Sequence, residues 1–206
     1  MRTRLLAAIA TIALTTISPL YADDRSDCTG SQNHDVVMAA CGRLIASETE
    51  TAEIKAVAYA NKALAFQRQG NFDAAIAELD QAITLNPKLS ALYFNRGVMH
   101  YRKEDAKKAV ADFTEAIRLD PTDLQPLVNR AIVAFDGDDY AHALADMDAA
   151  IKLSPKTPML FTYRAKIQLG AGNAERAIAD FKQVLKLDPA NEEAKAMLKD
   201  LGAEQK

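Results

Sequence analysis

Four prolines of this chain follow one another at a fixed interval of 34 residues, and an Asn, Asp or Ser precedes each of them. The four prolines are Pro87, Pro121, Pro155 and Pro189. Self-similarity at such a period is the signature of a repeat array, in which each unit contacts only its neighbours. Counting back from each proline gives four units, residues 56–89, 90–123, 124–157 and 158–191.

Each unit repeats the same residue types in register. In its first half, a large side chain precedes a small one by four residues: Tyr59, Tyr93, Leu127 and Phe161 precede Ala63, Gly97, Ala131 and Ala165. In its second half, Ala75, Ala109, Ala143 and Ala177 precede Leu79, Phe113, Met147 and Phe181 by the same spacing. Residues four apart share one face of a helix, so the pattern predicts two closely packed helices per unit. The proline ends the second helix.

This pattern resembles the tetratricopeptide repeat in four in-register units over residues 56–191. The resemblance implies an all-α fold, a right-handed α-solenoid of helix-turn-helix units. One helix pair cannot bury its apolar face alone, so the ends of the stack need caps. Asn191 before Glu192 and Glu193 is typical of a helix start, and Gly202 of a helix end. We therefore expect residues 192–206 to form a capping helix and tail.

The first 22 residues have the pattern of a cleavable secretory signal peptide. Arg2 and Arg4 precede an uncharged, mostly apolar run over residues 5–18, and the small Ala22 precedes two aspartates. The run is shorter than the roughly 20 residues that a spanning helix needs, so no stable membrane anchor is expected. A structural N-terminal helix is the alternative. The sequence thus predicts a periplasmic or secreted protein, most simply one of a bacterial periplasm, with cleavage near Ala22.

Residues 23–55 are interpreted as a degenerate half-repeat followed by a linker, because residues 35–45 match residues 73–83 at an offset of 38. At that offset, the resemblance places Cys28 and Cys41 where facing residues of a helix pair stand. In an oxidising compartment this arrangement implies a Cys28–Cys41 disulfide. A catalytic thiol and a metal site are the alternatives, although the spacing is not that of a Cys-x-x-Cys redox pair.

Composition and motifs argue against several function classes. The chain has 25 Lys and Arg against 28 Asp and Glu, a formal net charge of −3, so no nucleic-acid partner is expected. It contains no P-loop, dinucleotide-binding, zinc-protease or serine-hydrolase motif. We predict no enzyme activity, no catalytic residue, no cofactor and no metal. His100 is expected to be partly buried, and His142 solvated.

A periodic set of charges accompanies the repeat. Each unit has a basic residue in its first helix and an acid 16 residues later: Lys62, Arg96, Arg130 and Arg164, with Glu78, Asp112, Asp146 and Asp180. We expect an ion pair within each unit, worth ~0–1 kcal/mol where it is exposed. A charge ladder that binds a ligand is the alternative interpretation.

In the resembling family, ligands usually lie on the concave face formed by the first helices. Transferring those positions gives the groove candidates Asn61, Leu64, Phe94, Asn95, Val98, Tyr101, Asn129, Ile132, Phe135 and Tyr163. The three asparagines in this list recur at the repeat spacing. They either bind a peptide backbone or support neighbouring helices. The family's carboxylate clamp needs a Lys where Ala60 or Phe94 stands, so the resemblance does not extend to that role.

These observations predict an exported scaffold, without catalysis, that binds a protein or peptide in its concave groove. One alternative is a structural subunit of an envelope assembly, such as a pilus or secretion apparatus, acting through its convex face. Self-association and a role as an enzyme accessory are the others.

Overall fold

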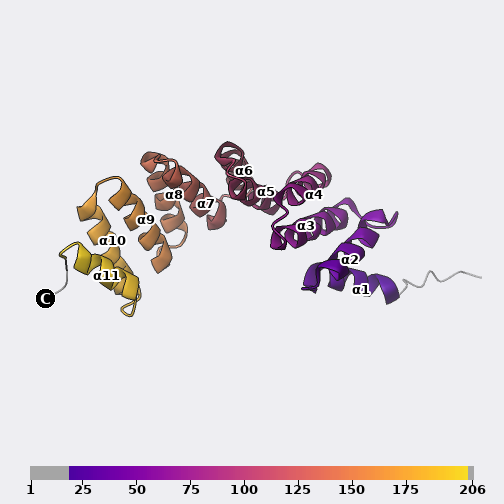
Figure 1. Ribbon diagram of the computed structural model, residues 1–206, viewed down its shortest axis with the longest axis horizontal. Coiled ribbons are helices and arrows are strands. Elements are labelled where there is room, and N and C mark those ends of the chain that lie inside the picture. Colours follow the sequence, from indigo (N-terminus) through magenta and orange to yellow (C-terminus); the bar gives the residue numbers. More distant parts are fainter. Residues whose placement is uncertain (1–18, 204–206) are drawn as a thin grey trace, which may run out of the picture.

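The computed structural model describes residues 19–203, and this part of the chain consists of eleven α-helices without a strand. The helices stack in chain order into an arch (Figure 1). They are α1 (Pro19–Gly30), α2 (His34–Ala46), α3 (Ala52–Arg68), α4 (Phe72–Leu85), α5 (Ser90–Arg102), α6 (Ala106–Leu119), α7 (Leu124–Asp136), α8 (Tyr140–Leu153), α9 (Pro158–Gly170), α10 (Ala174–Leu187) and α11 (Glu192–Asp200). The expected all-α solenoid is confirmed.

The ends of the helices follow from their sequence. Asn71, Asp105 and Asp139 cap the second helices α4, α6 and α8, and each side chain accepts a hydrogen bond from a backbone N–H three residues on. Helices α4, α6, α8 and α10 each end two residues before the periodic proline, because the residue before a proline disfavours the helical conformation. Helix α3 begins at Ala52, four residues earlier than the unit boundary at residue 56.

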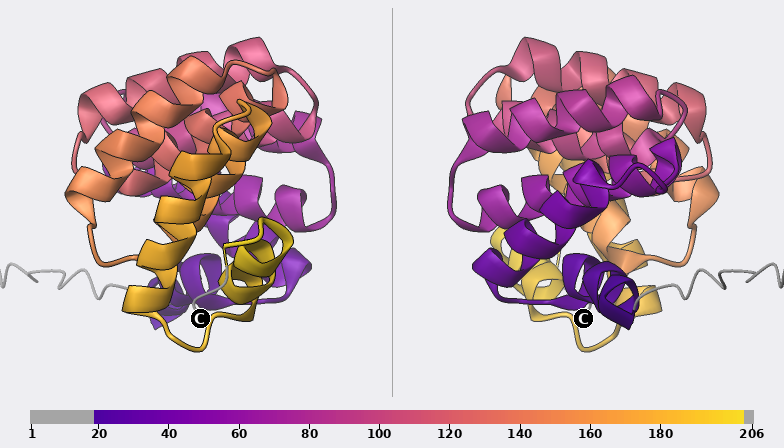
Figure 2. Two further views of the ribbon diagram at one scale, coloured as in Figure 1. Left: turned by 90° about the vertical axis from the view of Figure 1, so that its left-hand side faces the viewer. Right: turned by 90° about the vertical axis from the view of Figure 1, so that its right-hand side faces the viewer.

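Both ends of the arch carry additional helices. Helix α2 covers the segment 35–45 that resembles a second repeat helix, and the shorter α1 packs against it as its partner. At the other end, α11 packs on α10 as the expected capping helix, with Asn191 accepting from the N–H of Ala194. The end-on views place α1, α2 and α11 on the same side of the arch (Figure 2).

The predicted signal peptide falls largely on residues 1–18, which lie outside the described residues. Residues 19–22 form the first turn of α1. In the part of the chain that the structure describes, no helix is long and apolar enough to cross a membrane.

The first helices lie on the inner side of the arch. Helix α1 contacts α3, and α5 contacts α7, although a second helix separates the members of each pair in the sequence. In a curved stack, the elements nearer the centre of curvature are the ones that approach each other. The residues repeated in register form the core between first and second helices, where Leu79, Phe113, Met147 and Phe181 are completely or almost completely buried.

Gly97 lies at a close contact between the two helices of the second unit. A Cβ atom at this position would lie 2.8 Å from Cε1 of Phe113. The Phe94 ring also packs on Phe113, with ring centroids 5.9 Å apart. In the fourth unit, Ala165 stands at the glycine position and Thr162 at the position of Phe94. We therefore infer that the glycine makes room for the second phenylalanine.

The substitution Gly97→Ala is expected to lower the free energy of unfolding by up to about 2 kcal/mol. Overpacking costs ~1–3 kcal/mol, and the higher helix propensity of alanine offsets ~1 kcal/mol of it. In the double variant Phe94→Thr/Gly97→Ala, the loss is expected to be smaller than the sum of the two single losses. Urea unfolding followed by circular dichroism measures all three variants, and strictly additive losses would contradict the compensation.

Candidate functional site

The periodic charges form an ion pair within every unit, as the sequence analysis predicts. The bonds are Lys62–Glu78 at 2.6 Å, Arg96–Asp112 at 2.7 Å, Arg130–Asp146 at 2.7 Å and Arg164–Asp180 at 2.6 Å. Each of the three arginines binds its aspartate through two nitrogens. The three aspartates are buried, so the small free energy expected for exposed pairs does not apply to them.

The same arginines also connect neighbouring units. Nη1 of Arg96 donates to Asp80 of α4, and Nη1 of Arg164 donates to Asp148 of α8, both at 2.6 Å. The hydrogen bonds to their buried aspartates raise the pKa of both arginines. Because Arg96 and Arg164 already have two carboxylate partners each, these two arginines serve the stacking of the units and are poor candidates for a ligand site.

Two of the three periodic asparagines of the inner face form hydrogen bonds within their own helices. The side-chain N–H of Asn61 donates to the Val57 carbonyl at 3.0 Å, and that of Asn129 donates to the Gln125 carbonyl at 2.9 Å. Asn95 is partly buried. An amide group has two N–H donors and a carbonyl oxygen, so each engaged asparagine keeps the capacity for further hydrogen bonds.

Several apolar groove candidates are partly buried, so that part of each side chain packs on the core and part of it remains exposed. Phe94, Val98 and Tyr101 lie against a buried cluster that contains Phe113 and Val133. Ile132, Phe135 and Tyr163 pack in the same way against the core of α7 and α8. Leu64 is partly buried as well.

Tyr101 forms a side-chain hydrogen bond to the next unit. Its hydroxyl donates a hydrogen bond to Oδ2 of Asp136 at the end of α7, and this bond raises the pKa of Tyr101. Removing this side chain would therefore disturb the contact between α5 and α7 together with any partner site. Tyr101 is a poor residue for testing the groove.

The apolar side chains that the inner helices do expose stand elsewhere. Val57 on α3 is 41% exposed, and Met159 on α9 is 50% exposed. Val57 also borders a hollow of about 270 Å³ between α1 and α3, beside the Cys28 side chain. Met159 is one of the inner-face positions that the family resemblance gives for the fourth unit, whereas Val57 was missed. Both hold the same repeat position, three periods apart, and that shared position was the signal for Val57.

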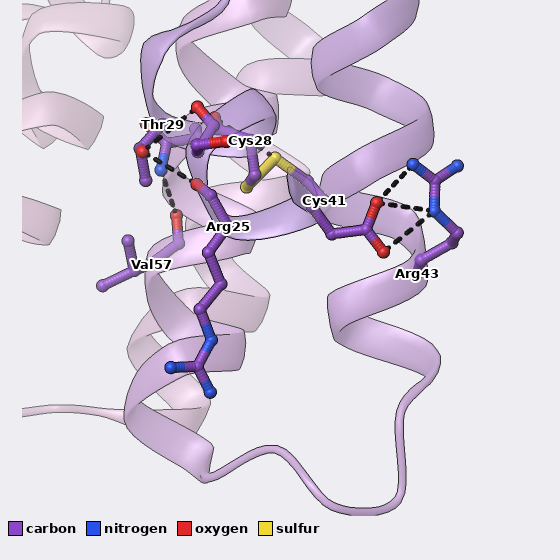
Figure 3. The surroundings of a disulfide bond; sticks show 9 residues. Arg25, Cys28, Thr29, Cys41, Arg43 and Val57 are labelled. Carbon is purple, nitrogen blue, oxygen red and sulfur yellow. Dashed lines mark hydrogen bonds and ion pairs between the residues drawn. A yellow bond between two sulfur atoms is a disulfide. The ribbon is translucent and has the colours of Figure 1, made fainter. Parts of the chain in front are cut away.

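A disulfide joins Cys28 of α1 to Cys41 of α2, with their Cα atoms 4.9 Å apart (Figure 3). Both residues are buried among apolar side chains that include Val37 and Leu44. An ion pair lies beside it, where Nε of Arg43 donates to the buried Asp24 at 2.9 Å. The pairing leaves neither sulfur as a thiolate, which a nucleophile or metal ligand requires. The cysteines therefore serve as a structural link.

Two histidines lie as the sequence analysis expects. His100 is partly buried, and burial lowers its pKa. His142 is exposed, with Nδ1 2.6 Å from Oδ2 of Asp139.

Comparisons with known proteins identify relatives by sequence pattern and by fold. A family model described as tetratricopeptide repeat matches residues 61–123 and 128–192. The crystal structure of MamA protein is 17% identical and aligns over 86% of this chain and 92% of that chain, with a TM-score of 0.71. MamA from Desulfovibrio magneticus RS-1 is 14% identical over 84% of this chain and 96% of that chain, with a TM-score of 0.72.

A third solved structure is described as YrrB, a TPR protein with an unusual peptide-binding site. It is 15% identical over 81% of this chain and 80% of that chain, with a TM-score of 0.62. At these identities the structural similarity establishes the fold. No curated protein sequence matches the chain.

Proposed function

Because the chain belongs to the tetratricopeptide repeat family, we propose that it is a protein-interaction scaffold that binds a protein or peptide segment on the inner face of its arch. The observation that carries this proposal is the pair of exposed apolar side chains, Val57 and Met159, on the inner helices α3 and α9. The scaffold has no catalytic role of its own in this proposal.

The inner face offers two kinds of interaction to a partner. Its exposed apolar side chains stabilise a complex when they are buried, at roughly 25 cal/mol per Å² of apolar surface. The remaining N–H and carbonyl groups of Asn61 and Asn129 provide hydrogen bonds to a peptide backbone. The description of YrrB as peptide-binding supports the same class of partner.

We further propose that the protein acts outside the cytoplasm, in a periplasm or after secretion. The Cys28–Cys41 disulfide supports an oxidising compartment, because such bonds persist mainly in exported proteins. The signal-like pattern of residues 1–22 supports the same location.

The double variant Val57→Asp/Met159→Asp is expected to lose the inner-face partner while keeping its helical content. A charge at each exposed apolar position opposes burial at an interface, and neither side chain belongs to the buried core. Leu153→Asp is the matched control, because Leu153 on the second helix α8 is 43% exposed. Affinity capture from envelope extracts with wild type and both variants, followed by mass spectrometry, measures the effect.

A protein that wild type and Leu153→Asp capture, and that the double variant loses, would identify the partner and support the inner face. Equal capture by all three proteins would show that the partner binds elsewhere than on the inner face. Loss of helical content in the double variant would show that the two positions are structural.

A further inference from the structure

A hollow of about 640 Å³ lies on the outer side of the arch between the second helices α6 and α8, with α7 as its floor. Val110, Val133 and Ala134 contribute to its apolar part, and Lys107 and Arg130 bring positive charge. No groove candidate of the sequence analysis lies here. The hollow lies at the junction of the second and third units, where the second helix of one unit meets both helices of the next.

At this junction, two alanines stand where other junctions have larger groups. Ala106 holds the position of Phe72 one unit earlier and of Tyr140 one unit later. The floor residue Ala134 likewise corresponds to His100 and Gln168. At the N-terminal junction, the matching residues His34 and Phe66 are in edge-to-face contact, with ring centroids 5.8 Å apart. Part of the hollow is therefore space that an aromatic ring takes up elsewhere in the same chain.

An ion pair is missing from the same place. One unit earlier, the ammonium group of Lys103 bonds to the Asp73 carboxylate across the junction. At the hollow, Gly137 stands at the position of the lysine, and Lys107 at that of the aspartate. Among the described residues, no carboxylate pairs with Lys107, whose side chain borders the hollow.

A carboxylate is missing as well. Arg96 and Arg164 each bind a second aspartate from the preceding unit, Asp80 and Asp148. The equivalent nitrogen of Arg130 meets only the hydroxyl of Thr114, at 2.9 Å. This junction thus lacks a ring, a bridging ion pair and an acid, all three of which the preceding junction provides from its own sequence.

The acids that border the hollow do not replace these groups. Asp146 is bound by two nitrogens of Arg130, and Asp139 caps α8 and lies 2.6 Å from Nδ1 of His142. An apolar slot of aromatic size therefore lies between an unpaired ammonium group and a guanidinium group with one carboxylate fewer than its neighbours.

We propose that this hollow is a second docking site, which binds a segment of a partner protein that presents an aromatic side chain next to an Asp or Glu. The ring enters the slot between Ala106 and Ala134, and the carboxylate pairs with Lys107 and the outer nitrogen of Arg130. This charge complementarity and the filled neighbouring junctions select an acidic aromatic segment over an apolar or basic one. The site is separate from the inner face, because the second helices α6 and α8 form its walls and only the outward side of α7 lines it.

Nuclear magnetic resonance titrations of the purified protein with a blocked Gly-Ser-Glu-Phe-Ser-Gly peptide test the proposal. The amide signals of Val110 and Ala134 are expected to shift on binding. Peptides with Gln in place of Glu, or Ala in place of Phe, are expected to bind at least fivefold and tenfold more weakly, respectively.

Two variants copy the neighbouring junctions and are thus expected to fold. Ala106→Phe fills the slot as Phe72 and Tyr140 do, and it is expected to weaken binding at least tenfold. Thr114→Asp gives Arg130 the carboxylate that Arg96 and Arg164 have, and it is expected to weaken only the Glu peptide. Unshifted hollow signals at millimolar peptide, full binding by Ala106→Phe, or equal affinity for the Glu and Gln peptides would overturn the proposal.

Discussion

Removal of the Cys28–Cys41 disulfide is expected to lower the free energy of unfolding of the helix pair α1–α2 by about 3 kcal/mol. The bond closes a loop with a sequence separation of 13 between two buried sulfur atoms. A short helix pair at the end of a solenoid has one neighbour, α3, and so buries less surface than an internal unit. Most of the chain-entropy gain from the disulfide therefore acts on this pair.

The loss is expected to stay local, because each unit of a repeat protein contacts only its neighbours. Hydrogen exchange with mass spectrometry measures it in the Cys28→Ala/Cys41→Ala variant and in wild type that was reduced under denaturing conditions and refolded. Amides of α1 and α2 are expected to lose protection by about two orders of magnitude, the factor that corresponds to about 3 kcal/mol.

Amides of α8 are the internal control, since this helix lies far along the stack from α2. Equal protection of α1 and α2 with and without the disulfide would show that burial alone holds the N-terminal pair. A loss of protection along the whole chain would instead show that the arch unfolds as one cooperative unit.

The sequence was sufficient to predict the stack of helices, because a fixed period repeats every packing relation. The spacing of Arg96 and Asp112 placed them across one helix pair, and the structure brings them to 2.7 Å. The same logic predicted facing positions for the two cysteines. In each case the relation depends on backbone position within a unit, and the repeat sets that position.

Exposure on the inner face was not predictable in the same way. The position of a residue within the repeat determines the direction of its Cα–Cβ bond. The burial of its side chain depends on the size of the neighbouring side chains. Phe94 is partly buried against Phe113, beside which Gly97 leaves room. Tyr101 bonds across to Asp136, a contact between units that the pattern within one unit does not contain.

The outer hollow was missed for a related reason. Ala106 and Ala134 are ordinary repeat residues when each is considered alone. Their significance appears only when a second helix is compared with the first helix of the next unit, since the two alanines belong to different units. A comparison of residues across unit boundaries was the signal that could have found it.

The buried acid of the second ion pair is expected to matter far more than its exposed counterpart on the same arginine. Asp112→Ala is expected to lower the free energy of unfolding by about 3 kcal/mol, because it leaves Arg96 partly buried without its two-nitrogen partner. The arginine remains charged, since its pKa lies far above neutral pH. It therefore cannot relieve the loss by releasing a proton.

Asp80→Ala is the matched control, because Asp80 binds the same guanidinium group at 2.6 Å from a side chain that is 50% exposed, against 9% for Asp112. Asp80→Ala is expected to lower the free energy of unfolding by less than about 1 kcal/mol, as for other exposed ion pairs. Urea unfolding of both variants measures the difference. Equal losses would contradict the structural interpretation of the ladder, because Asp112 is buried and binds two nitrogens of Arg96, whereas Asp80 is half exposed and binds one.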